Sequence, residues 1–110
     1  MLFRSATSEI EQGTATCTVS SARYKHDFES LDSGLATVLR MPTYSFIRND
    51  HPELGRMVGL KAEDVAVIEP RLVILDREGR PDRVLYENYT AILTKAIQEL
   101  EERVRKVESR

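Results

Sequence analysis

The longest regular pattern of apolar residues lies in the last part of the chain. From Glu87 to Arg110 there is no Gly or Pro, and most residues are good helix formers. Apolar side chains recur here at alternating steps of four and three residues: Leu93, Ile97, Leu100, Val104 and Val107. This spacing predicts a helix over about residues 87–110 with a coiled-coil seam of about two and a half heptads.

Two arrangements would cover this apolar stripe. The helix could lie on the core of its own domain, or it could pack against the same stripe of another copy. Because the stripe continues beyond the length of helix that the small body can cover, the pattern favours oligomerisation.

Shorter apolar patterns precede this helix and predict a small body. Apolar residues recur at helical spacing over 28–41, and Asp32 or Ser33 is the predicted N-cap of a helix that follows it and ends at Pro42. The other expected elements are a strand over 43–48, a polar loop over 48–56, a strand over 57–60, a helical segment over 61–68, a strand over 72–75, a hairpin turn over 76–83 and a returning strand over 84–86. The predicted fold class is therefore α+β: short helices and strands with a β-hairpin, followed by a long C-terminal helix.

Residues 1–19 have a different composition, which is rich in Ser and Thr and poor in large apolar groups. Thr14, Thr16 and Thr18 alternate with Ala15, Cys17 and Val19, which is the period-two pattern of a short strand. Such a strand carries too little apolar surface to stay folded alone. We expect it to pair with neighbours, with Cys17 on its packed face.

Composition and charge exclude several classes of function. The 110 residues form one small domain with 41% hydrophobic and 31% charged residues, and the net charge of −2 makes a nucleic-acid partner improbable. No apolar run is long enough for a membrane span, and the charged start does not resemble a signal peptide. A single cysteine and two distant histidines, His26 and His51, predict no disulfide framework, no metal site and no cofactor.

Candidate chemistry lies in the polar cluster SSARYK, where Ser20 and Lys25 are five residues apart. A serine becomes a nucleophile when a base takes its proton, and a neutral lysine can be that base. On a helix this spacing separates two side chains by about 140°, and on a strand it places them on opposite faces. A dyad therefore requires the chain to bend between them. Otherwise Ser20 is a helix cap and Lys25 is a solvated side chain.

The order of motifs resembles the S74 peptidase family, the C-terminal intramolecular chaperone domains of bacteriophage tail spikes and tail fibres. SSARYK is similar to the family pattern Ser-Asp-x-Arg-Leu-Lys at Ser20, Arg23 and Lys25. The next family blocks follow in the same order. The family's helix and strand correspond to LATVLRMPTYSF, its "IGLIAQEV" segment to MVGLKAEDVAVIEPRLV, and its terminal helix to VLYENYTAILTKAIQEL. The resemblance covers residues 20–110.

This resemblance implies a homotrimer that helps the preceding fibre or spike of the same polypeptide to fold and then cuts itself off. Ser20 would be the nucleophile and Lys25 the general base of a self-cleaving serine endopeptidase, with Val19–Ser20 as the scissile bond. Arg23 would organise the site. Residues 1–19 would be the end of a β-structured stalk, and 20–110 the chaperone domain. The precursor would assemble in the host cytoplasm and remain, after release of the domain, in the virion tail.

Two departures from the pattern keep alternatives open. The family Asp after the serine is Ser21 here, and the family Leu before the lysine is Tyr24. A trimerisation and chaperone module that stays attached is one alternative, and a plain coiled-coil adaptor is the other. Ile97 at an a position with Leu100 at d favours two helices over three, whereas the resemblance favours three.

Overall fold

The computed structural model describes residues 18–110, which belong to two compact units, 1–30 and 31–110. In the first unit the described chain has one regular element, the 3-10 turn η1 (Ala22–Tyr24). The predicted strand of alternating threonines lies almost wholly outside the described residues, and so does Cys17. The two units are described separately below.

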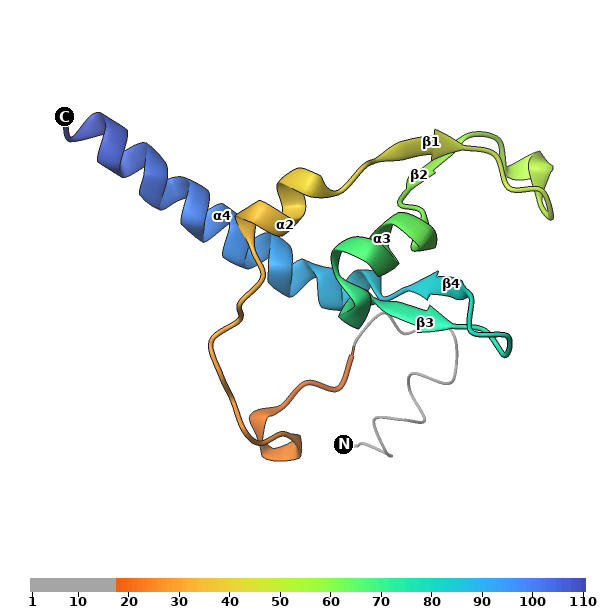
Figure 1. Ribbon diagram of the computed structural model, residues 1–110, viewed down its shortest axis with the longest axis horizontal. Helices are drawn as coiled ribbons and strands as arrows, with labels where there is room; N and C mark the ends of the chain where they lie inside the picture. The colour runs from red at the N-terminus through yellow and green to blue at the C-terminus, as the bar shows by residue number, and fades with distance from the viewer. Residues whose placement is uncertain (1–17) are drawn as a thin grey trace, which may run out of the picture. The chain divides into compact units, whose positions relative to one another are not determined.

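The second unit is a mixed α+β structure, as predicted, with short helices and strands before one long helix (Figure 1). Its elements are α2 (Leu35–Arg40), β1 (Tyr44–Phe46), η2 (Pro52–Leu54), β2 (Met57–Gly59), α3 (Ala62–Ile68), η3 (Pro70–Leu72), β3 (Val73–Leu75), β4 (Pro81–Val84) and α4 (Tyr86–Glu108). Strands β1 and β2 form one antiparallel hairpin and β3 and β4 a second. The sequence pattern predicts the four strand regions but only one of the two hairpins.

The returning strand of the second hairpin begins earlier than predicted. We expected the returning strand at 84–86, but β4 is Pro81–Val84 and Tyr86 already begins α4. The reason is a tight turn around Asp76, whose Oδ1 accepts hydrogen bonds from the backbone N–H groups of Glu78 and Arg80, both at 2.9 Å. The turn is complete at Arg80, and Pro81 is tolerated because a two-stranded ladder has only edge strands.

Helix α2 begins later than predicted and has a different cap. The apolar spacing extends back to Phe28, but the residues before Leu35 are not helical, and the helix begins one or two residues after the start that a cap at Ser33 or Asp32 implies. Its N-cap is Gly34, not Asp32 or Ser33, and the N–H of Leu35 donates to Glu99 Oε1 of α4 at 2.7 Å. A side chain at Gly34 would collide with that carboxylate. The cap is thus supplied from a distant part of the sequence.

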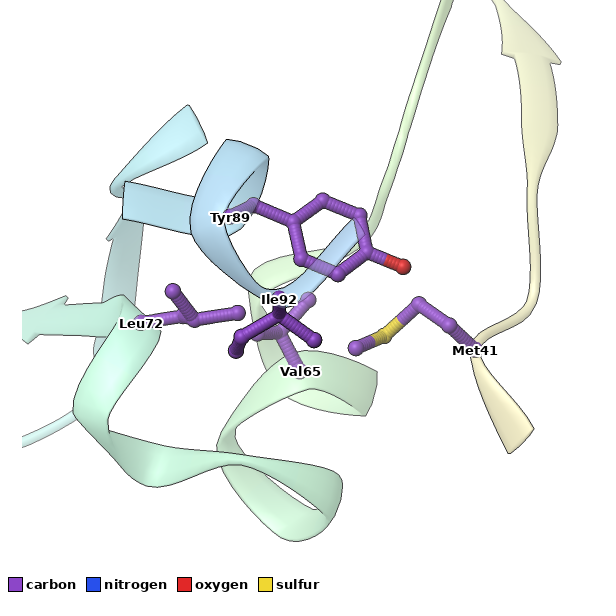
Figure 2. Close-up of a cluster of buried hydrophobic side chains, with 5 residues drawn as sticks. All are labelled: Met41, Val65, Leu72, Tyr89 and Ile92. Carbon is purple, nitrogen blue, oxygen red and sulfur yellow. The ribbon is translucent and has the colours of Figure 1, made fainter. Parts of the chain in front are cut away.

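The core of the second unit is small and is built around the start of α4. Tyr89 and Ile92 of α4 pack with Val65 of α3, Leu72 of η3 and Met41 (Figure 2). Val65 is completely buried. As predicted, α2 ends before Pro42, and Met41 then contributes its side chain to the core. Burying side chains of this size contributes about 1.5–3 kcal/mol each.

A buried carboxylate lies beside this core. Glu69 is only 6% exposed, and its two oxygens accept hydrogen bonds from Arg71, from Nε at 2.7 Å and from Nη2 at 2.9 Å. Arg71 Nη2 also donates to Asp32 Oδ1 at 2.8 Å. The Arg71 guanidinium lowers the pKa of Glu69 from 4.5 to about 2. The charged form of Glu69 therefore stabilises the folded state.

We expect the free energy of unfolding to decrease as the pH falls from about 4.5 to about 2. The pKa of Glu69 is lowered in the folded state. Its contribution to stability is therefore complete above the pKa of the unfolded state and is lost as the pH falls through the pKa of the folded state. Denaturant unfolding at constant protein concentration measures this. Glu69→Gln is expected to lower stability at pH 7 and to flatten the acid dependence, whereas Glu102→Gln, at an exposed site, changes neither. An equally steep acid dependence in Glu69→Gln would contradict the assignment.

Candidate active site

A tight turn provides the bend that the SSARYK cluster requires. The backbone N–H of Tyr24 donates to the carbonyl of Ser21 at 3.1 Å, and that of Lys25 donates to the carbonyl of Ala22 at 3.0 Å. Ser21 is the N-cap of this 3-10 turn, and its Oγ accepts from the backbone N–H of Arg23 at 3.3 Å. At Lys25 the chain returns to an extended conformation, with φ −134° and ψ 159°.

This turn brings the two candidate catalytic side chains together. Lys25 Nζ donates a hydrogen bond to Ser20 Oγ at 2.7 Å. A regular helix or strand would separate them at this spacing, but a 3-10 turn flanked by extended residues does not. The contact lies within one chain and within one unit.

The distance is suitable for proton transfer from the serine to the lysine. A general base must lie within about 2.6–3.2 Å of the group that it deprotonates. In the observed bond the lysine is the donor, so the reverse transfer requires the neutral amine. Ser20 and Lys25 are both exposed, as is Val19, at 39%, on the other side of the predicted scissile bond. Burial favours the neutral form of an amine, so covering this site would activate the pair.

Arg23, the predicted organising residue, lies at the centre of the turn. Its Nη1 donates to Ser21 Oγ at 3.1 Å and its Nη2 to the hydroxyl of Tyr24 at 2.8 Å. The guanidinium carbon also lies 4.5 Å from the centroid of the Tyr24 ring. Its side-chain hydrogen bonds thus go to the two residues that depart from the family pattern. Nothing in the sequence pattern indicates the contact between Arg23 and Tyr24.

The predicted seam residues lie on an exposed face of α4. In the single chain the exposed fraction of these side chains is between 37% and 66%, for Leu93, Ile97, Leu100, Val104 and Val107. A second stripe of the same helix, Tyr89, Ile92 and Ala96, is buried against the body. At 3.6 residues per turn the centres of the two stripes are about 70° apart around the helix axis. The body therefore covers a neighbouring face and leaves the seam open.

Two features of other protein classes are absent from residues 18–110. This part of the chain has no helix that is both long and apolar enough to cross a membrane. It also has no group of three or more His, Cys, Asp or Glu side chains that could hold a metal ion.

The chain is similar to a known protein family. The family model Peptidase_S74, chaperone of endosialidase, matches residues 20–74, which is half of the chain. The match begins at Ser20 and ends within β3, and over these residues it confirms the resemblance read from the motifs. No curated protein and no solved structure matches the chain.

Proposed function

The chain belongs to the Peptidase_S74 family, chaperone of endosialidase, and from this membership we propose that residues 20–110 are an intramolecular chaperone that releases itself. The domain trimerises through α4, assists folding of the phage tail fibre or spike that precedes it, and then cuts the Val19–Ser20 bond. The observation that supports the proposed cleavage is the 2.7 Å hydrogen bond between Lys25 Nζ and Ser20 Oγ, at the start of the family match.

The proposed reaction has two steps. The neutral amine of Lys25 takes the proton of the Ser20 hydroxyl, and Oγ attacks the carbonyl carbon of Val19. The peptide C–N bond breaks, the Ser20 nitrogen takes up the proton from the lysine, and an ester now joins Val19 to Ser20 Oγ. Water then attacks this ester, leaving the carboxylate of Val19 and a free Ser20 with its amine and hydroxyl.

The chemistry favours a single event within one polypeptide. Nucleophile and scissile bond belong to the same residue, so the attack is intramolecular, and well-oriented attacks of this kind reach effective molarities of about 10⁵–10⁸ M. Residues 1–19 then belong to the assembled stalk, which remains in the virion tail. We expect no turnover of an added peptide that spans Val19–Ser20.

A second candidate is a trimerisation and chaperone module that stays attached. It is favoured by the exposure of Ser20 and Lys25, because a solvated lysine is a poor base. The intact mass of the purified chain after overnight incubation distinguishes the two. Autoproteolysis gives a new species spanning residues 20–110 and the matching fragment of residues 1–19. A trimer that keeps its full mass would overturn the cleavage proposal and leave the attached module.

A further inference from the structure

We propose that Tyr24 and Ser21 are positioning residues, which hold Arg23 so that the turn delivers Lys25 to Ser20; this rests on the proposed cleavage. We call this group of three side chains the Arg23 clamp. None of the three needs to touch the reacting atoms. The clamp acts on the shape of the backbone between nucleophile and base.

The contacts of Arg23 span the whole turn. Its guanidinium binds Ser21, at the N-cap, through Nη1, and Tyr24, the last turn residue, through Nη2. The face of the Tyr24 ring lies against the same guanidinium. One side chain thus links the first and last residues of the bend by two hydrogen bonds and a cation–π contact.

The turn depends on such contacts because little else stabilises it. Its backbone contributes two hydrogen bonds, and none of its three residues is buried. Short 3-10 segments have poor hydrogen-bond geometry, and a single turn fixes several dihedral angles for each bond gained. Without packing, the population of the bent form is set largely by side-chain interactions. The clamp is the principal one among the described residues of the turn.

The clamp also connects the two departures from the family pattern physically. An Asp at position 21 would hold the arginine by an ion pair as well as a hydrogen bond, because both partners would be charged. The Ser21 hydroxyl offers a weaker acceptor. The hydroxyl and ring of Tyr24 supply a second acceptor and a cation–π contact, which a Leu cannot. We infer that Tyr24 compensates for the missing carboxylate.

The test is a cycle of full-length variants: the unmodified chain, Tyr24→Leu, Ser21→Asp and the double variant. We expect Tyr24→Leu to slow cleavage about tenfold, from the loss of one hydrogen bond and one cation–π contact. Ser21→Asp is expected to cut at least as fast as the unmodified chain, because its carboxylate holds Arg23 more strongly, and the double variant is expected to recover to within about threefold of the unmodified rate. If Tyr24 only contributed to folding, Ser21→Asp would not rescue its loss.

Amide hydrogen exchange at Tyr24 and Lys25 in the same chains tests the clamp independently of cleavage. We expect Tyr24→Leu to speed the exchange of both N–H groups about tenfold, and the double variant to restore their protection. If the unmodified chain does not cut but exchange follows this pattern, the clamp stands and the proposed cleavage fails. Unchanged exchange in Tyr24→Leu, or a cleavage defect that Ser21→Asp does not repair, would overturn the clamp.

Discussion

Ser20→Ala is expected to abolish cleavage at Val19–Ser20 and to leave only the intact chain after incubation. The substitution removes the oxygen that attacks the Val19 carbonyl, and no other hydroxyl occupies that position. Lys25→Ala is expected to have the same effect because it removes the base 2.7 Å from Ser20 Oγ. Each loss is expected to exceed about 10³-fold, the usual scale for members of a nucleophile–base pair.

Lys25→Arg is the sharper variant, since it keeps the positive charge and a hydrogen-bond donor. A guanidinium stays protonated at any pH at which the fold survives, so this variant is also expected not to cut. Ser30→Ala and Lys106→Ala, both at exposed positions, are matched controls and are expected to cut normally. Normal cutting by Lys25→Arg would show that the lysine acts through its charge and not as a base.

The pH dependence of the unmodified chain separates a lysine base from a histidine base. His26 follows Lys25 directly, and its Nε2 lies 3.7 Å from Asp27 Oδ2 in an exposed position. The reference pKa of a histidine side chain is about 6.5 and that of a lysine side chain about 10.4, so a histidine base gives a rate that levels off at a lower pH than a lysine base. We expect the rate to keep rising above pH 7.

The local patterns predicted most elements but not the contacts that join distant parts of the chain. The spacing of Leu93, Ile97 and Leu100 predicts an exposed stripe on a long helix, and the structure has both. The buried stripe, Tyr89, Ile92 and Ala96, also has helical spacing and could have been found in the same window. The cap of α2 could not, because Glu99 lies 64 residues from Leu35 and nothing local indicates it.

In the candidate site, too, the sequence indicates the residues but not the contacts that join them. Spacing alone argues against a contact between Ser20 and Lys25, because both regular structures separate them. The resemblance to a family motif indicated the pair, and the 3-10 turn supplies a physical reason for the contact. That turn is held by Arg23 with Ser21 and Tyr24, the two positions at which the chain departs from the family pattern. A pattern of residue types does not reveal that two departures meet at one side chain.

Changing Leu93, Ile97 and Leu100 together to Gln is expected to convert a trimer into monomers. In the single chain these side chains are 37%, 66% and 50% exposed, and covering them in a coiled coil contributes roughly 1 kcal/mol each. Gln is a good helix former, and the stripe that packs on the body is left intact, so the monomer is expected to keep its fold. Light scattering and circular dichroism measure these two outcomes.

The matched control changes the same helix away from both stripes. Ala91→Ser, Gln98→Ser and Glu102→Gln together alter three exposed positions and are expected to leave the trimer unchanged. A monomeric mass for the unmodified chain would contradict trimerisation. A dimeric mass would show that the preference of Ile97 and Leu100 for two helices prevails over the resemblance.

The monomeric seam variant is also expected to stop cutting, although Ser20 and Lys25 are intact. In the single chain both side chains are exposed, and water stabilises the charged lysine, which cannot take a proton. Assembly would exclude water from the pair and favour the neutral amine, so cleavage would follow folding and association. Intact mass measured on the monomer and on the control variant, incubated side by side, tests this order of events. A monomer that cuts at the control's rate would refute the coupling of assembly to cleavage while leaving the dyad itself in place.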